Sequence, residues 1–230
     1  RVLHTSKHIF TVSDFSKKEI CDYYNVNPNK VAIIYNAVNG MFHHITDNAL
    51  GKEKYLITVS SFKENKNFIM AYKAFKLAQK YVEGLKLYII GDVKTGSFNN
   101  MDVLVSQLQQ DKDVVLLGRV ADTELIKFYS NAMAFVFPSF YEGFGIPVLE
   151  AQACGCPVIS SDSSALPEVL GDVQFMLDFS KFKDIYGKFF NHWMRDLGHF
   201  FSKKTCRKPS QGGCDRSKRS HRRQLLRSLR

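Results

Sequence analysis

The chain has 230 residues, of which 45% are hydrophobic, and a formal net charge of +10 at neutral pH. That length allows one complete domain and part of another, and no apolar run approaches the roughly 18 residues that a membrane-spanning helix needs. The excess charge is local, because residues 201–230 hold eleven Lys or Arg and one Asp, and the first 200 residues form a neutral, ordinary globular body with 21 charges of each sign.

The first 45 residues predict two short strands around one helix. The predicted elements are a strand at 8–13, a helix that ends at 24, a turn at 27–29 and a strand at 31–35. A capping box at 16–19 is expected to open the helix. A polar connector is expected at 40–51. The chain starts at Arg1 with neither an initiator Met nor a signal peptide, so we expect it to begin in mid-protein.

From residue 55 onward, strands alternate with helices. The predicted strands are 55–59, 85–90, 114–117, 133–137, 157–159 and 173–177. The predicted helices are 68–81, 101–110, 123–130 with Asp122 as its cap, 148–154, and a short one within 163–169. In the first helix, the apolar residues at helical spacing are expected in the core: Phe68, Ala71, Tyr72, Phe75 and Ala78. Such alternation is typical of an α/β fold with a doubly wound, Rossmann-like parallel sheet.

One strand–loop–helix–strand unit, residues 132–162, carries the strongest functional signal. In parallel sheets, ligands bind outside the carboxyl ends of the strands, where this loop is expected. Gly143 and Gly145 let the backbone approach a ligand closely, and the N–H groups of the helix that Pro147 opens suit a diphosphate. Glu142 and Glu150 could accept hydrogen bonds from hydroxyls, which suggests a sugar nucleotide. The alternative is a plain strand–helix connection with a solvated Glu150.

The same unit resembles a known family. The run from Pro138 to Ile159 reads Pro-Ser-x-x-Glu-Gly-Phe-Gly-x-Pro-x-x-Glu-Ala-x-Ala-x-Gly-x-Pro-Val-Ile, with seven residues between its two glutamates. It resembles the donor-site motif of the GT-B glycosyltransferases of family 4, the glycosyl transferases group 1. Residues 12–17, 34–39 and 163–169 also match family segments, although Ala37 stands where the family usually has Gly. The resemblance fades from about Lys188.

The resemblance implies a retaining transfer of a mannose-type sugar from a nucleoside diphosphate to a glycan or lipid-linked acceptor in polysaccharide biosynthesis. It implies no metal and no cofactor. Glu142 would be catalytic, lying against the donor sugar, and Glu150 would hold the ribose. The other implied donor-binding residues are Lys66, Gly143, Phe144, Gly145, Ile146 and Ser61. Lys66 matches the family's phosphate-binding lysine, whereas Ser61 replaces an Arg that commonly precedes it, a loss for which Lys63 could compensate.

The resemblance also divides the chain. Residues 1–45 would be the end of an amino-terminal domain and a hinge, residues 46–190 the nucleotide-sugar-binding domain, and residues 191–230 a basic tail. For this tail we favour disorder of non-family origin over a membrane-surface patch, which would mean peripheral membrane association, and we expect no nucleic-acid partner. The alternative function is that of a non-catalytic nucleotide-binding fragment without an acceptor domain.

Cysteine usage bears on location and on metal binding. The five cysteines, Cys21, Cys154, Cys156, Cys206 and Cys214, include no Cys-x-x-Cys pair. Reduced thiols and a cytoplasmic location, with the inner face of the membrane as a variant, are therefore expected. Cys154 and Cys156 could ligate a metal, but burial around a helix end is the favoured interpretation.

Overall fold

A computed structural model describes residues 2–46, 53–92, 99–171 and 175–177, with the backbone alone at 99–103 and 175–177. All of them fall within one compact unit, residues 1–183. Among the described helices, none combines the length and the apolar character that crossing a bilayer requires. The predicted basic tail, with its competing interpretations, lies outside the described residues, and the predicted domain boundaries stay predictions.

Six parallel strands form the main sheet. They are β3 (Tyr55–Val59), β4 (Lys86–Ile90), β5 (Val114–Gly118), β6 (Ala134–Phe137), β7 (Val158–Ser161) and β8 (Phe175–Leu177). The predicted α/β class with a doubly wound parallel sheet is confirmed, and each strand ends within two residues of its predicted bounds. The strands are rich in β-branched and aromatic residues, which a sheet covered on both faces can bury.

The strand order, β5-β4-β3-β6-β7-β8, places a switch point between β3 and β6. The chain runs outward from β3 to β5 and then returns to the other side of β3, where Ile57 pairs with Phe135. The connections after β3 and after β6 therefore leave the carboxyl edge of the sheet side by side. In open α/β sheets, a crevice at such a point is where ligands bind.

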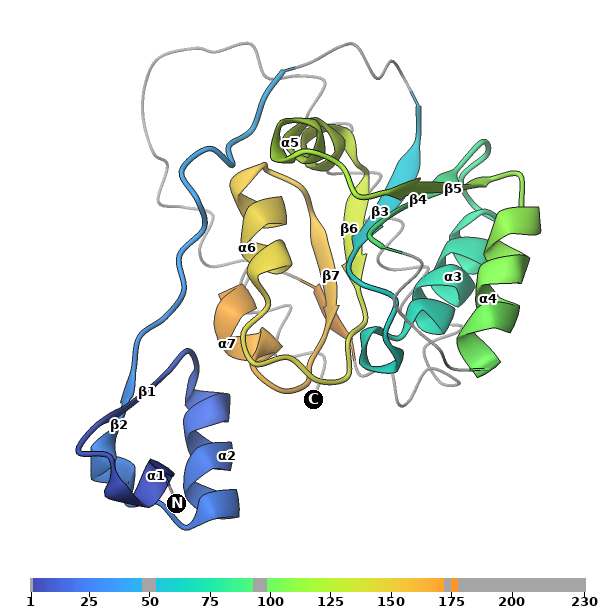
Figure 1. Cartoon of the computed structure of the whole chain (residues 1–230). Coiled ribbons are helices and arrows are strands. Elements are labelled where there is room, and N and C mark those ends of the chain that lie inside the picture. Colours follow the sequence, from blue (N-terminus) through green and yellow to red (C-terminus); the bar gives the residue numbers. More distant parts are fainter. Residues whose placement is uncertain (1, 47–52, 93–98, 172–174, 178–230) are drawn as a thin grey trace, which may run out of the picture. The chain divides into compact units, whose positions relative to one another are not determined.

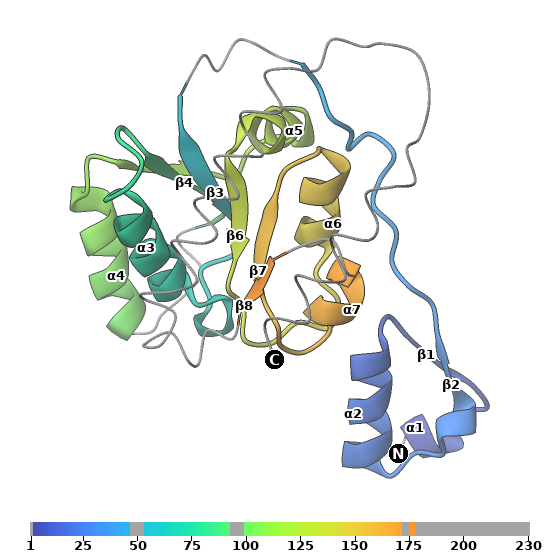
Figure 2. The same cartoon turned by 180° about the vertical axis from the view of Figure 1, so that it is seen from behind.

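Helices cover both faces of this sheet. Figures 1 and 2 show α3 (Phe68–Ala78) and α4 (Asn99–Gln110) on one face, and α5 (Asp122–Asn131), α6 (Ile146–Ala153) and α7 (Leu166–Leu170) on the other. Several predicted helix ends were wrong by one to three residues, including the end of α3 and the start of α5. Helix α3 stops before Tyr81, because the last residues turn more tightly and the Tyr81 N–H donates to the carbonyl three residues back. Asp122 is the first residue of α5 rather than its cap, which is Ala121.

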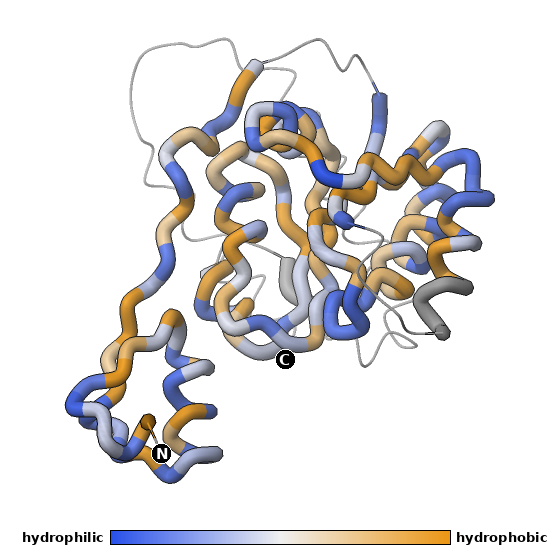
Figure 3. Tube along the Cα trace, viewed as in Figure 1, coloured by the Kyte–Doolittle hydropathy of each residue, from blue (hydrophilic) through white to orange (hydrophobic). Residues whose placement is uncertain are grey.

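The core lies between the sheet and these helices. Figure 3 shows the hydrophobic residues concentrated on the strands and the polar residues on the outward turns of the helices. The side chains with almost no exposed surface include Ile57, Phe75 and Phe135. The predicted core of α3 is confirmed at Phe68, Ala71, Phe75 and Ala78. It was wrong at Tyr72, which is only half-buried because its hydroxyl group donates to Asp111.

The residues before the main sheet form a smaller parallel pair. In chain order they are α1 (Val2–Thr5), β1 (Ile9–Thr11), α2 (Asp14–Tyr24), the 3₁₀ turn η1 (Pro28–Lys30) and β2 (Val31–Ile33), with β1 beside β2. The predicted capping box was misplaced. Helix α2 begins at Asp14, and its cap is Ser13, whose hydroxyl group accepts from the Ser16 N–H at 3.0 Å.

Candidate functional site

Two loops at the switch point are joined to each other by hydrogen bonds. One follows β3 and the other follows β6. The Asn65 carbonyl accepts from the Ser139 hydroxyl group and from the Phe140 N–H, both at 2.8 Å, and the Asn67 amide donates to the Pro138 carbonyl at 3.2 Å. Because these bonds connect segments more than 70 residues apart, the two loops form one structural unit.

An ion pair lies at the centre of this unit. Lys66 is the last residue of the 3₁₀ turn η2 (Glu64–Lys66), and its Nζ lies 2.6 Å from Oε1 of Glu142. Only 17% of the lysine side chain and 12% of the glutamate side chain are exposed. The Phe137 ring, with its centroid 5.7 Å from Nζ, covers one side of the cation. The structure thus brings together the predicted catalytic carboxylate and the predicted phosphate-binding cation.

Serines following β7 fix the loop that carries Glu142. The Glu142 N–H donates to the Ser164 hydroxyl group at 2.9 Å, and the Ser163 hydroxyl group donates to the Ser139 carbonyl at 3.1 Å. Ser164 adopts a left-handed backbone conformation with φ of 55°. These positioning residues were not among the predicted site residues. Their signal was a run of polar residues directly after a predicted strand, at the same edge of the sheet.

The start of α6 offers an anion fewer free N–H groups than the sequence suggested. Pro147 has no N–H, and the Val148 N–H bonds to the Gly145 carbonyl at 3.0 Å. In the described part of the chain, the N–H groups of Gly145 and Ile146 are left as the unengaged donors of this turn. Gly145 is required here, because its φ is 109° and a Cβ would lie 2.7 Å from Leu166 Cδ2.

The flanking residues of this loop have different surroundings. Gly143 has room for a Cβ, whose nearest neighbour would be the Ser16 hydroxyl oxygen at 3.7 Å. Phe144 is buried, and its ring lies against Tyr35 with 6.3 Å between centroids, so its side chain packs rather than faces solvent. Ile146 is exposed. Of these three predicted donor-binding residues, only Ile146 presents its side chain outward.

Glu150 lies on the side of α6 that meets α5. Its Oε2 accepts a hydrogen bond from the hydroxyl group of Tyr129, a fully buried residue, at 3.5 Å. Burial raises the pKa of the Glu150 carboxyl group, the negative charge of Asp122 raises it further, and the hydrogen bond from Tyr129 offsets part of the rise. Among the described contacts, no hydrogen bond or ion pair joins Glu150 to the Lys66–Glu142 pair.

Ser61, a predicted donor-binding residue, lies two positions before the lysine expected to compensate for the missing Arg. Its carbonyl accepts from the Lys63 N–H at 2.9 Å, and the Lys63 side chain is exposed. Within the described residues, Lys63 makes no ion pair. Lys66 is therefore the cation that the structure places against Glu142, and Lys63 lies at the surface of the same loop.

Segments outside the sheet also contact the loop. The hydroxyl groups of Ser13 and Ser16 both donate to the Gly143 carbonyl, at 2.7 and 3.2 Å. The Glu168 carboxylate accepts from the two backbone N–H groups at 14 and 15, at 2.9 and 3.1 Å. An anion at these positions is favourable, because they are the first turn of α2. Two segments that resemble the family, 12–17 and 163–169, therefore both contribute hydrogen bonds at this site.

The cysteines beside α6 pack in the core. Cys154 and Cys156 are both buried, and burial raises the pKa of the Cys154 thiol to about 11. Across the described ranges, no group of three or more His, Cys, Asp or Glu side chains is arranged to hold a metal ion. The expectation that the reaction needs neither metal nor cofactor stays a prediction.

Comparison with known proteins assigns a family to the part of the chain that contains the main sheet. The model of the family described as glycosyl transferases group 1 matches residues 43–185. The chain is 30% identical over 185 residues to O-antigen chain mannosyltransferase B of Escherichia coli, covering 76% of the chain and 49% of that protein. It is 36% identical over 166 residues to O-antigen chain mannosyltransferase RfbU of Salmonella typhimurium, covering 71% and 44%. The chain spans about half the length of these curated relatives.

Solved structures share the fold. Alr3699/HepE of Anabaena, in complex with UDP-glucose, superposes with a TM-score of 0.68 at 15% identity, covering 85% of the chain and 57% of that structure. A glycosyltransferase from Rickettsia africae superposes with a TM-score of 0.63 at 19% identity, covering 79% and 54%. At such identities, the likeness shows the arrangement of strands and helices alone.

Proposed function

We propose a function for this chain from one premise: the chain belongs to the glycosyl transferases group 1. In this proposal, residues 53–171 bind the nucleotide sugar of a retaining glycosyltransferase. The enzyme moves a mannose-type sugar from a nucleoside diphosphate to a glycan or lipid-linked acceptor in polysaccharide biosynthesis. The O-antigen mannosyltransferases among the relatives support the sugar and the pathway, and a structural neighbour in complex with UDP-glucose supports the class of donor.

The observation that carries this proposal is the Lys66–Glu142 pair at the switch point. A lysine and a glutamate reach this place from loops after two different strands, and hydrogen bonds fix both loops. A half-buried cation and the unengaged N–H groups at the start of α6, on loops at the same switch point, suit the diphosphate of a nucleotide sugar. A carboxylate beside that cation suits the hydroxyl groups of the sugar.

The proposed chemistry depends on charge that develops on the leaving group. As the bond between the sugar and the diphosphate breaks, negative charge grows on the diphosphate oxygens. The N–H groups of Gly145 and Ile146, which the fold holds in place, would stabilise that charge, together with Lys66 Nζ once the diphosphate displaces or shares its contact with Glu142. Glu142 would lie against the donor sugar, and Glu150 would accept from the ribose hydroxyl groups.

Two further points belong to the proposal. Because fixed cations and N–H groups can stabilise the diphosphate, we propose that no metal takes part. A cytoplasmic location, with peripheral association at the inner face of the membrane, fits a lipid-linked acceptor.

Calorimetric titration of the chain with UDP, GDP, UDP-glucose and GDP-mannose tests the donor site. We expect the chain to bind at least one nucleotide together with its nucleotide sugar, and we expect Lys66→Ala to weaken that binding at least tenfold. Lys63→Ala is the matched control, because it removes an exposed lysine from the same loop. Equal losses in the two variants, or no binding by the parent, would refute the donor site.

A second candidate is a nucleotide-binding chain that does not transfer sugar by itself. The observation that favours it is that the chain spans about half the length of its curated relatives. A turnover assay with the donor that binds, and with mannose oligomers as acceptors, separates the two. Nucleotide binding without turnover supports the second candidate, and sugar transfer supports the first.

A further inference from the structure

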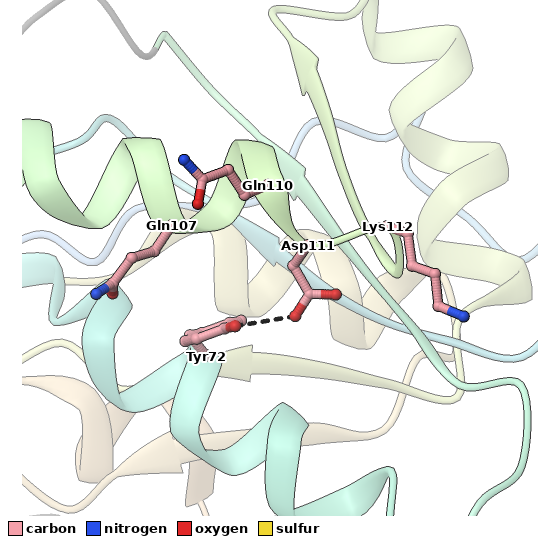
Figure 4. A pocket seen from close by; sticks show the side chains of 5 residues that line it. All are labelled: Tyr72, Gln107, Gln110, Asp111 and Lys112. Carbon is pink, nitrogen blue, oxygen red and sulfur yellow. Dashed lines mark hydrogen bonds between the residues drawn. The ribbon is translucent and has the colours of Figure 1, made fainter.

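A polar hollow lies away from the donor loops. It has a volume of about 570 Å³ and is lined by Tyr72, Gln107, Gln110, Asp111 and Lys112 (Figure 4). Its walls come from α3, from the end of α4 and from the turn before β5. None of the predicted donor-site residues lines it.

The carboxylate in this hollow is held in place. Asp111 Oδ2 accepts from the Tyr72 hydroxyl group and from Lys76 Nζ, both at 2.9 Å, and Oδ1 accepts from the Asp113 N–H at 3.1 Å. Burial alone would raise the pKa of Asp111, but these donors hold it below its ordinary value. The group is therefore ionised at neutral pH, and the ammonium group of Lys76 balances its charge.

Two amides beside it are available to a ligand. Gln107 and Gln110 are three residues apart on α4, and both are exposed. No hydrogen bond joins either side-chain amide to the described part of the chain. A primary amide offers two donors and an acceptor, which matches a hydroxyl group that both donates and accepts. Figure 4 shows Gln107 extending from α4 on the side of the Tyr72 ring, whereas the Gln110 amide extends toward the other side of the helix.

We propose that this hollow binds a neutral oligosaccharide. A sugar ring presents a face of C–H bonds, which can lie against the Tyr72 ring on the side away from Lys76 Nζ, which is 6.0 Å from the ring centroid. It also presents a rim of hydroxyl groups, which amides and a carboxylate can bind. An anionic ligand fits less well, because Asp111 itself carries negative charge and Lys112 is the one cation among the described lining residues. The hollow is open to solvent, so it can hold part of a chain that continues beyond it.

The position of the hollow separates it from the donor site. Asp111 and Lys112 precede β5 and so lie at the amino edge of the sheet, whereas Lys66 and Glu142 follow the carboxyl ends of β3 and β6. A five-residue strand is about 16 Å long, so the two sites are separated by roughly that distance. The hollow therefore holds a glycan away from the reacting atoms, and its occupancy does not depend on the proposed transfer reaction.

An NMR titration of the ¹⁵N-labelled chain with a mannotetraose tests this proposal. We expect millimolar binding, with the largest amide shifts at residues 107–113 and on α3. Tyr72→Ala and the double variant Gln107→Ala/Gln110→Ala should each weaken binding at least tenfold, whereas Tyr72→Phe keeps the ring and should weaken it less. The double variant changes exposed residues, so it tests the site even if Tyr72→Ala unfolds. Tyr23→Ala, at a tyrosine that is 82% exposed on α2, is the control and should change nothing.

Several results would overturn the proposal. The absence of shifts, or shifts confined to the loops of Lys66 and Glu142, would mean that the hollow is not a glycan site. Tighter, salt-sensitive binding of a sulfated, heparin-type tetrasaccharide would mean that the lysines select an anion instead. UDP titrated into the double variant should bind as it binds the parent, and a change would mean that the two sites are not separate.

Discussion

Glu142→Gln should strengthen UDP binding while it abolishes sugar transfer. In the free chain the Glu142 carboxylate forms an ion pair with Lys66, and Nζ and Oε1 are 2.6 Å apart. A diphosphate must displace or share that contact, and it also meets the negative charge of Glu142. Glutamine keeps the shape of the side chain and removes the charge, so the cation becomes available to the phosphate oxygens.

The size of the gain follows from the burial of the pair. Exposed ion pairs contribute about 0.2–1 kcal/mol, and charge-assisted hydrogen bonds away from water contribute more. With 17% and 12% of the two side chains exposed, we place the pair near 1 kcal/mol, which corresponds to roughly fivefold tighter binding of UDP. UDP-sugar should gain less, because Glu142 is also proposed to contact the sugar.

Calorimetry on a double-mutant cycle measures this coupling. The four proteins are the parent, Glu142→Gln, Lys66→Met, and the chain with both changes. The gain from Glu142→Gln should vanish when Lys66 is absent, since the effect acts through that lysine. If Glu142→Gln binds UDP no better than the parent does, or if its gain persists without Lys66, the reasoning is refuted.

Three other changes have definite expected outcomes. Lys66→Ala should lower UDP affinity and flatten the dependence of that affinity on salt, because one cation leaves the site. Titrations from low to high ionic strength measure this slope, and an unchanged slope would mean that Lys66 is only a surface residue. Gly145→Ala should lower the unfolding free energy, measured by urea denaturation, by about 1–3 kcal/mol, because φ is 109° and the new Cβ would lie 2.7 Å from Leu166 Cδ2. Gly143→Ala should change it by no more than about 1 kcal/mol, because there is room for a Cβ at that position. Burial raises the pKa of Glu150 in the folded state, so the folded protein loses stability as pH rises through that pKa. Glu150→Gln should therefore increase the unfolding free energy more at pH 7 than at pH 4. Equal gains at both pH values would contradict this.

Hydrophobic periodicity was enough to predict the sheet. Each strand is a short apolar run ended by a turn, and tertiary packing shifts such runs only at their ends. Caps were harder to place, because local signals compete. Ser13 and Ser16 both suit a helix start, and Ser13 is the cap because its hydroxyl group accepts from the Ser16 N–H. Both hydroxyl groups also donate to the Gly143 carbonyl, 130 and 127 residues away. A sequence pattern carries no information about such a distant partner.

The candidate site was predictable only in part. Glu142 and Lys66 could each be singled out, but their contact depends on β6 lying beside β3, a fact of strand order that no local pattern contains. Tyr72 shows the opposite error. Its spacing on α3 matched the core, yet an acceptor on a separate segment, Asp111, draws its hydroxyl group to the rim of a hollow.

The most direct test of the donor site is a crystal structure of the chain with UDP bound. We predict that the diphosphate lies within hydrogen-bond distance of Lys66 Nζ and of the N–H groups of Gly145 and Ile146. The 2.6 Å contact between Lys66 and Glu142 should be lengthened or broken. A diphosphate bound elsewhere on the chain, with that contact intact, would contradict the account.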